Sequence, residues 1–91
     1  MPELTSRYAE LMNVSYKSVK ITSAQKRFGS CSGKNNICFS YILMQYPIEA
    51  VEYVVVHELA HTVHHNHSRE FYSLIERYLP DYKQRERLLK K

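Results

Sequence analysis

All five histidines of this chain lie between residues 57 and 67, in the run HELAHTVHHNH. On a helix, four residues advance about 6 Å and turn about 40° past a full revolution, so His57 and His61 share one face and can hold one metal ion. Glu58 points about 100° away, where its carboxylate can reach a water held at an open position of the metal. The spacing is typical of zinc hydrolases, with Glu58 as general base.

The third protein ligand that a catalytic zinc ion usually has must come from another residue. His64 lies on the same helical face as His57 but about 10.5 Å further along the axis, too far from an ion held beside His61. His65 is less favourable in both height and angle. We therefore expect His64 and His65 to be solvated or to lie outside the ligand shell.

His67 is the predicted third ligand. Asn66 precedes it, and asparagine tolerates the left-handed conformation with which many helices end, so the chain can turn back under the metal. Ser68 follows as an N-cap for the next helix, supported by Glu70 in the first turn. The alternative third ligand is a glutamate of that helix, Glu76.

The helix that carries these histidines is apolar on nearly every side. The face opposite His57 carries Ile48, Val55, Leu59, Thr62 and Val63, and the histidine face carries Ala50, Tyr53, Val54 and Ala60. Such a helix is buried, and buried histidines need partners. This context favours a metal site over an accidental match to the motif.

The length and composition predict one domain over residues 1–91. A chain of 91 residues buries about 60 to 65% of its unfolded surface, enough for one modest core, to which bound zinc can add stability. No stretch approaches the length of apolar residues that a membrane span needs, and residues 1–3 do not begin a signal peptide. We expect a cytoplasmic protein without a membrane association.

The two cysteines, Cys31 and Cys38, flank a turn. In the cytoplasm a disulfide framework is not expected. We predict small buried side chains on a hairpin, in preference to a disulfide or a second metal site.

The formal charge of +4 is unevenly distributed. The segment 14–40 has no acidic residue and contains Lys17, Lys20, Lys26, Arg27 and Lys34. The aromatic residues interleaved with them are Tyr16, Phe28, Phe39 and Tyr41. A basic, aromatic sheet of this kind can bind nucleic acid or an acidic peptide, although a solvated sheet face is the simpler interpretation.

Apolar periodicity and turn residues predict an α+β fold. The expected elements are a helix over 2–13, strands over 15–22, 27–32 and 36–41, and helices over 47–65, 68–79 and 80–89. Asn13 is expected to stop the first helix, and residues 32–35 have turn chemistry.

Several runs of this chain resemble the YgjP-like zinc metallopeptidases, relatives of the SprT-like and other zincin peptidases. The runs are RFGSCS at 27–32, YVVVHELAH at 53–61, NHS at 66–68 with Phe71, and YLPDY at 78–82. The resemblance extends over about residues 19–89. One departure is Phe28, where the family usually has tryptophan, which keeps an aromatic ring but loses an indole donor.

The resemblance implies a minimal zincin core, in which a small antiparallel sheet packs on the zinc helix, with further helices at both ends. An edge strand of the sheet would hold an extended peptide or protein substrate. The resemblance also implies His57, His61 and His67 as ligands of Zn2+ and Glu58 as the catalytic base.

The predicted reaction is hydrolysis of a peptide bond, in which Glu58 takes a proton from water and later delivers it to the leaving amine. Tyr53 and Arg27 are candidates to stabilise the tetrahedral oxyanion. Ribosome-maturation endoribonucleases share the histidine spacing but have glycine in place of Glu58, so this residue favours a peptidase. The remaining alternative is a non-catalytic, zinc-stabilised module that binds nucleic acid or protein, in which His64 or Cys31 would supply a fourth ligand.

Overall fold

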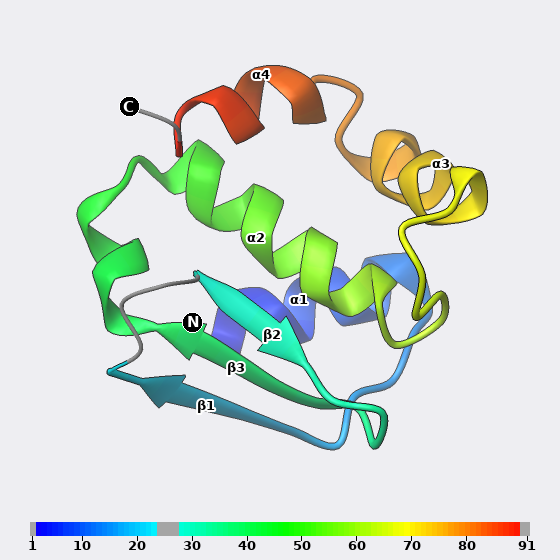
Figure 1. Cartoon of the computed structure of the whole chain (residues 1–91), viewed down its shortest axis with the longest axis horizontal. Coiled ribbons are helices and arrows are strands. Elements are labelled where there is room, and N and C mark those ends of the chain that lie inside the picture. Colours follow the sequence, from blue (N-terminus) through cyan, green and yellow to red (C-terminus); the bar gives the residue numbers. More distant parts are fainter. Residues whose placement is uncertain (1, 24–27, 90–91) are drawn as a thin grey trace.

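The computed structural model describes residues 2–23 and 28–89 and has the predicted α+β architecture (Figure 1). Its elements in chain order are α1 (Pro2–Met12), β1 (Ser18–Thr22), β2 (Gly29–Cys31), β3 (Asn36–Ser40), the 3-10 helix η1 (Tyr41–Gln45), α2 (Ile48–Ala60), α3 (Arg69–Tyr78) and α4 (Tyr82–Arg87). The order of α-helices and strands matches the sequence prediction, whereas η1 was not predicted. None of the described helices combines the length and apolarity needed to cross a lipid bilayer.

The sheet has the strand order β1-β3-β2, with β3 antiparallel to β2 but parallel to β1. The expected antiparallel sheet is therefore wrong for the β1–β3 pair. The chain passes from β1 to the far edge strand β2, and β3 then returns into the space between them (Figure 1). Strand β3 carries the fully buried Ile37 and Phe39. In the central position, its backbone N–H and C=O groups can form hydrogen bonds with a neighbouring strand on each side.

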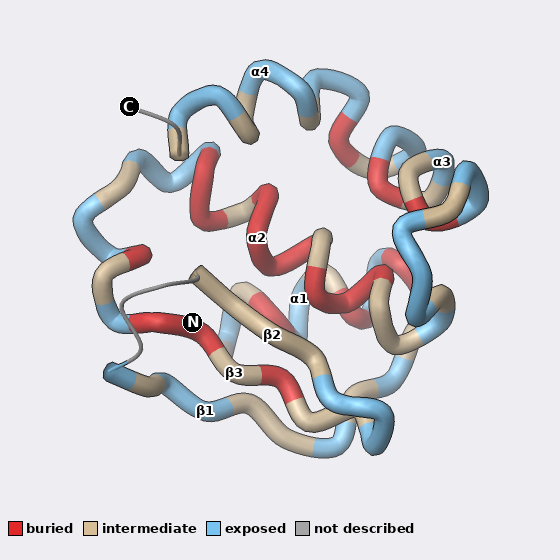
Figure 2. The backbone as a smooth tube through the Cα atoms, in the orientation of Figure 1, coloured by how far each residue is buried: buried red, intermediate tan, exposed pale blue. Residues whose placement is uncertain are grey.

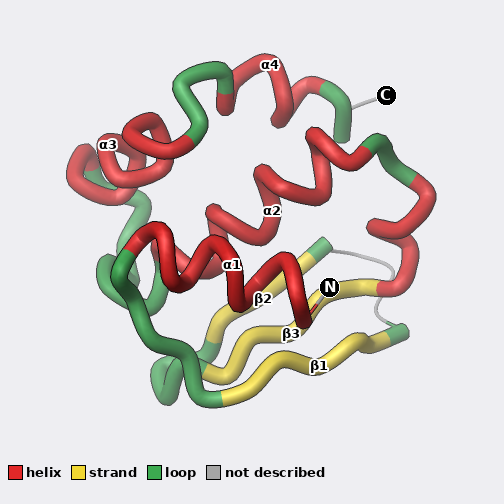
Figure 3. The backbone as a smooth tube through the Cα atoms, turned by 180° about the vertical axis from the view of Figure 1, so that it is seen from behind, coloured by secondary structure: helices red, strands yellow, loops and turns green. Residues whose placement is uncertain are grey.

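Helix α2 is the centre of the fold and contacts α1, α3, α4 and β2. Most of its residues are buried (Figure 2). Helix α1 packs on α2 at the side seen in Figure 3. The apolar helix predicted from the sequence is thus the main core element, although Ile48 and Val63, at the two ends of the predicted stripe, are exposed.

Helix boundaries agree with the local signals in two places. Asn13 has φ 56° and follows the last residue of α1, as a left-handed helix stop should. The Ser68 hydroxyl accepts a hydrogen bond from the Phe71 backbone N–H at 3.4 Å and caps α3 as predicted.

The carboxyl end of α2 differs from the prediction, because the helix ends at Ala60 rather than near His65. The Thr62 hydroxyl donates to the Leu59 carbonyl at 2.6 Å, and the backbone N–H groups of Thr62 and Val63 bond to carbonyls three residues back. These bonds close a tight turn in place of another α-helical turn. Asn66 has no positive φ, so the expected left-handed conformation there is wrong.

The two cysteines and one aromatic residue of the basic segment, Phe39, also differ in part from the expectations. Cys31 and Cys38 are free thiols, half-buried rather than buried. Cys31 pairs with Ile37, whereas Cys38 pairs with Ser30, so the two thiols point to opposite faces of the sheet. Phe39 is fully buried and adds nothing to a surface for nucleic acid.

Candidate metal centre and active site

Three histidines meet at the carboxyl end of α2. His57 and His61 lie one helical turn apart, and His67 approaches from the loop between α2 and α3. One ring nitrogen of each lies within 4.8 Å of the others, and the three side chains form a group that could hold a metal ion. Their ring centroids are separated by 4.8 to 5.6 Å. The structure thus brings together the three residues predicted as metal ligands.

Phe71, the third residue of α3, packs against all three histidine rings. It is fully buried and stacks on His61 with ring centroids 4.4 Å apart. It also meets the edges of His57 and His67, at 5.0 and 5.1 Å. Among the sequence features, Phe71 was named only beside the family-like run NHS, and its ring was given no role. No local signal places the ring against the histidines, because His67 lies in the loop before α3 and the contact depends on how α2 and α3 pack.

The orientation of His61 is set by a backbone contact. Its Nδ1 lies 3.1 Å from the carbonyl oxygen of His64, which favours an Nδ1–H donor and leaves Nε2 for a metal. Burial and the nearby His57 lower the pKa of His61 below its ordinary value, which favours the neutral imidazole that metals bind. His64 therefore contributes through its main chain rather than its ring.

Glu58 lies beside the histidines with 5% of its surface exposed. Its Oε2 is 3.2 Å from His57 Nδ1. Its Oε1 is buried and has no hydrogen-bond partner among the described residues. Leaving a buried carboxylate oxygen without a hydrogen bond is costly. This atom therefore needs a hydrogen-bond donor that the described residues do not supply. A water held at a metal would supply that donor, so three imidazoles beside this carboxylate fit a catalytic metal ion.

Strand β2 lies against Glu58 at Gly29. A Cβ atom at this position would be 3.2 Å from Glu58 Cγ, from Val54 Cγ1 and from the Cys38 carbonyl oxygen. These distances are tighter than ordinary van der Waals contacts, so only glycine lets the edge strand come this close to the carboxylate. In the sequence, Gly29 stood within a family-like run, but nothing in its spacing gave it a role.

Two cavities meet at this point. One has a volume of about 260 Å³ and is lined by the histidine cluster, Glu58 and the residues of β2, together with His65. The other, of about 300 Å³, extends from His57 and Glu58 toward α4. Glu58, the predicted base, thus lines both cavities, whereas the rest of its side chain is packed.

The other residues proposed as ligands do not join the cluster. Among the described residues, Glu76, His64 and Cys31 are absent from the group that could hold a metal. Burial, with the nearby charge of Glu58, raises the pKa of the Cys31 thiol, which disfavours the thiolate that a metal would need. His65 is exposed at the rim, as expected for a solvated residue.

The two candidates for oxyanion stabilisation have different outcomes. The Tyr53 hydroxyl donates to Glu86 Oε2 at 3.0 Å and is therefore already engaged away from the cluster. Burial, followed by this hydrogen bond, raises the pKa of Tyr53 well above its ordinary value. Arg27 lies outside the described residues.

A comparison with protein families gives a match over residues 1–91 to the family described as "YgjP-like, metallopeptidase domain". The chain belongs to this family. The YgjP-like domain is also similar to the crystal structure of the metallopeptidase zymogen of Pyrococcus abyssi abylysin. The TM-score is 0.86 at 21% identity, over 97% of this chain and 90% of that chain. A comparison with curated protein sequences gave no significant match.

The similarity to abylysin shows a shared fold, and the family match supports a hydrolase of the metallopeptidase class. A metallopeptidase needs a metal ion, and the three histidines form a group that could hold one. The substrates of this class are peptides or proteins. The resemblance noted in the sequence is therefore confirmed at the level of family and fold.

Proposed function

We propose that this YgjP-like domain is a zinc-dependent peptidase in which His57, His61 and His67 bind Zn2+ and Glu58 is the general base. The observation that carries this proposal is the Oε1 atom of Glu58, which is buried beside the histidine cluster without a hydrogen-bond partner among the described residues. Zinc is the usual choice for three imidazoles in a hydrolase, although imidazoles also accept other transition metals.

The number of ligands supports a catalytic rather than a structural role for the metal. Structural zinc sites are usually closed by four protein ligands, whereas catalytic sites keep one position open. The cluster of described residues has three members. A zinc-stabilised binding module would need a fourth ligand, and neither His64 nor Cys31 joins the group.

A zinc ion bound there would lower the pKa of its water and polarise the carbonyl group of the scissile bond. Glu58 would accept a proton from the attacking water and deliver it to the leaving amine. Its burial keeps the carboxylate in one position, and Gly29 keeps β2 close against it. A peptide added along the outer edge of β2 would then run past Glu58, since β2 is an edge strand of the sheet.

The test compares the zinc-loaded wild type with Glu58→Gln, which preserves the shape of the side chain but cannot accept the proton. Glu49→Gln is the matched control, because Glu49 is an exposed glutamate of the same helix. Each protein is incubated with a diverse peptide library, new termini are identified by mass spectrometry, and bound zinc is quantified.

We expect one zinc per chain in all three proteins and cleavage by the wild type and Glu49→Gln alone. Equal cleavage by Glu58→Gln would show that Glu58 is not the base. If none of the proteins cleaves any peptide while each holds one zinc ion, peptide hydrolysis by this chain is refuted. Replacement of His67 by alanine should lower the zinc content, whereas replacement of His65 should not.

A further inference from the structure

The cavity of about 300 Å³ has a composition that suits one kind of side chain. It begins at His57 and Glu58 and extends along α2 toward α4. Its walls are largely apolar and are formed by Phe28, Val54 and Leu89. The carboxylate of Glu86, on α4, lines the same cavity. A long side chain that enters beside Glu58 would therefore meet apolar surface first and then a negative charge.

The Glu86 carboxylate is held in place by its neighbours. Its Oε2 accepts the hydrogen bond from the Tyr53 hydroxyl at 3.0 Å. The raised pKa of Tyr53 keeps that phenol in its neutral, donating form.

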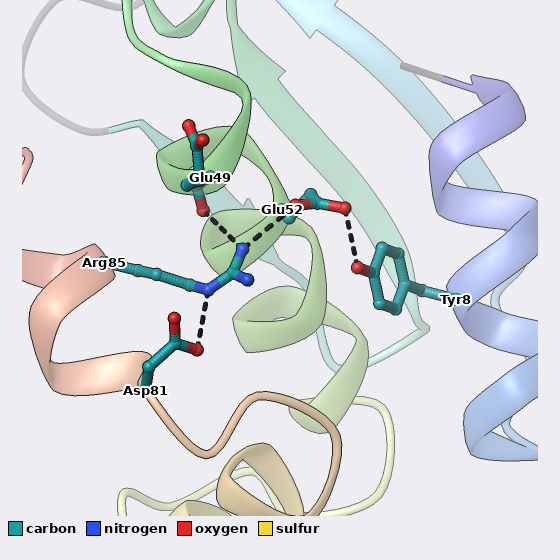
Figure 4. Close-up of polar contacts among 5 residues, drawn as sticks. All are labelled: Tyr8, Glu49, Glu52, Asp81 and Arg85. Carbon is teal, nitrogen blue, oxygen red and sulfur yellow. Dashed lines mark hydrogen bonds and ion pairs between the residues drawn. The ribbon is translucent and has the colours of Figure 1, made fainter.

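Arg85, the residue before Glu86, fixes α4 to α2 (Figure 4). It donates to Glu52 Oε1 at 3.0 Å, to the Glu49 carbonyl at 3.2 Å and to Asp81 Oδ1 at 2.9 Å. Glu52 also accepts a hydrogen bond from Tyr8 at 2.8 Å, which adds α1 to the network. The wall that carries Glu86 is thus anchored to the active-site helix before any substrate binds, and preorganisation of this kind favours selective binding.

We propose that this cavity binds a lysine or arginine side chain of the substrate next to the scissile bond, with its stem along the apolar walls and its cationic head at Glu86. The inference rests on the proposed peptidase function and adds the substrate class. Among the described residues that line the cavity, Glu58 and Glu86 are acidic and none is lysine or arginine. An acidic side chain would be repelled, and a purely apolar one would add no hydrogen bond or opposite charge at the Glu86 carboxylate.

The size of the preference is limited by the surroundings of Glu86. Lys83 and Arg87 line a neighbouring hollow that shares Glu86, and their charges compete for the carboxylate. Hydrogen bonds between charged groups are about twice as strong as neutral ones, but partial exposure weakens them. We therefore expect about a tenfold preference for lysine over an uncharged residue of the same length.

The experiment uses pairs of peptides that differ only by lysine or norleucine at one position, placed in turn on either side of the cleaved bond. Norleucine has the same stem but no ammonium group. With zinc-loaded wild type, kcat/KM should be about tenfold higher for lysine at one of these positions. Glu86→Gln should remove the difference, because its amide oxygen can still accept from Tyr53 but carries no charge. Glu10→Gln, which removes an exposed charge on α1, should keep it.

Binding gives a second readout that does not depend on turnover. In a zinc-loaded Glu58→Gln background, calorimetry should show tighter binding of the lysine peptide, and the added Glu86→Gln change should abolish that difference. Unfolding temperatures of all variants exclude a general loss of structure. Equal values for lysine and norleucine, or a difference that persists in Glu86→Gln, would overturn the assignment of the cavity while leaving the peptidase proposal intact. Absence of cleavage together with the expected binding difference would refute the peptidase proposal alone.

Discussion

Replacement of Gly29 by alanine tests whether the close approach of β2 positions the predicted base. The added methyl group would lie 3.2 Å from Glu58 Cγ, Val54 Cγ1 and the Cys38 carbonyl oxygen. Carbon atoms pack best at about 3.5 to 4.0 Å, so contacts must open by about 0.3 to 0.8 Å. Because the Cys38 carbonyl belongs to the central strand, most of this movement falls on the side chains of α2.

Two effects of different size follow from this movement. Overpacking of this kind costs about 1 to 3 kcal/mol of unfolding free energy, and each kcal/mol lowers Tm by about 4 to 8 °C in a domain of this size. Misplacement of a catalytic group by about 1 Å can cost about a hundredfold in rate, so a few tenths of an ångström should lower kcat about tenfold. Zinc affinity should change little, since the three atoms nearest to this methyl group belong to residues other than the histidines.

The matched control is Gly33→Ala, because the chain has only two glycines. A Cβ at Gly33 would have no atom within 4 Å, and this glycine has no positive φ. Its replacement should leave kcat unchanged and raise stability slightly, by about 0.4 to 1 kcal/mol at most. Measurements of kcat, zinc content and Tm on both variants test whether β2 holds Glu58 in position. If Gly29→Ala keeps the wild-type kcat and Tm, β2 does not hold Glu58 in the way described.

Three further predictions concern the packing around the site. Phe71→Leu should weaken zinc binding by about 10- to 100-fold in a chelator competition, because the flat ring that orients the histidines is lost, whereas Phe39→Leu, at an equally buried position on β3 whose ring stacks on none of the three histidines, should not. Removal of zinc by a chelator should lower Tm by an amount that grows with the free zinc concentration used before, and an unchanged Tm would contradict a site formed by the folded state. Burial and the hydrogen bond to Glu52 raise the pKa of Tyr8 to about 12 from 10.0 in the unfolded chain, so its contribution is complete below pH 10 and is lost as the pH rises toward 12. Tyr8→Phe should flatten this alkaline loss of stability in denaturant titrations, and an identical pH profile would argue against the contact.

Features that depend on neighbours in the sequence were predicted well. Asn13 and Ser68 act through backbone groups within three or four residues, so their roles as helix stop and N-cap could be recognised from residue type and position. The pairing of His57 with His61 is likewise a property of one helical turn. The end of α2 was placed too late because the Thr62 hydroxyl competes for a backbone carbonyl, and periodicity does not report such competition.

The proximity of His67 to the other two histidines was expected for the wrong reason. Asn66 was expected to reverse the chain through a left-handed conformation, which it does not adopt. Instead, His67 reaches the cluster together with Phe71, whose ring packs against all three histidines once α3 is in place. This contact joins two helices and depends on how they pack.

The sequence by itself determined the helix that bears His57 and His61, the neighbouring Glu58 and the α+β class, because these follow from spacing and periodicity within a few residues. Only the tertiary structure decided that β3 lies between β1 and β2 and is parallel to β1. The alternation of apolar and polar residues along a strand is the same for a parallel and an antiparallel neighbour, so the strand direction depends on the connections. The same holds for Gly29 against Glu58, for Phe71 against the three rings and for Glu86 in the wall of the cavity. Each of these contacts joins separate elements, and their distances are set by the packing of the whole core around α2.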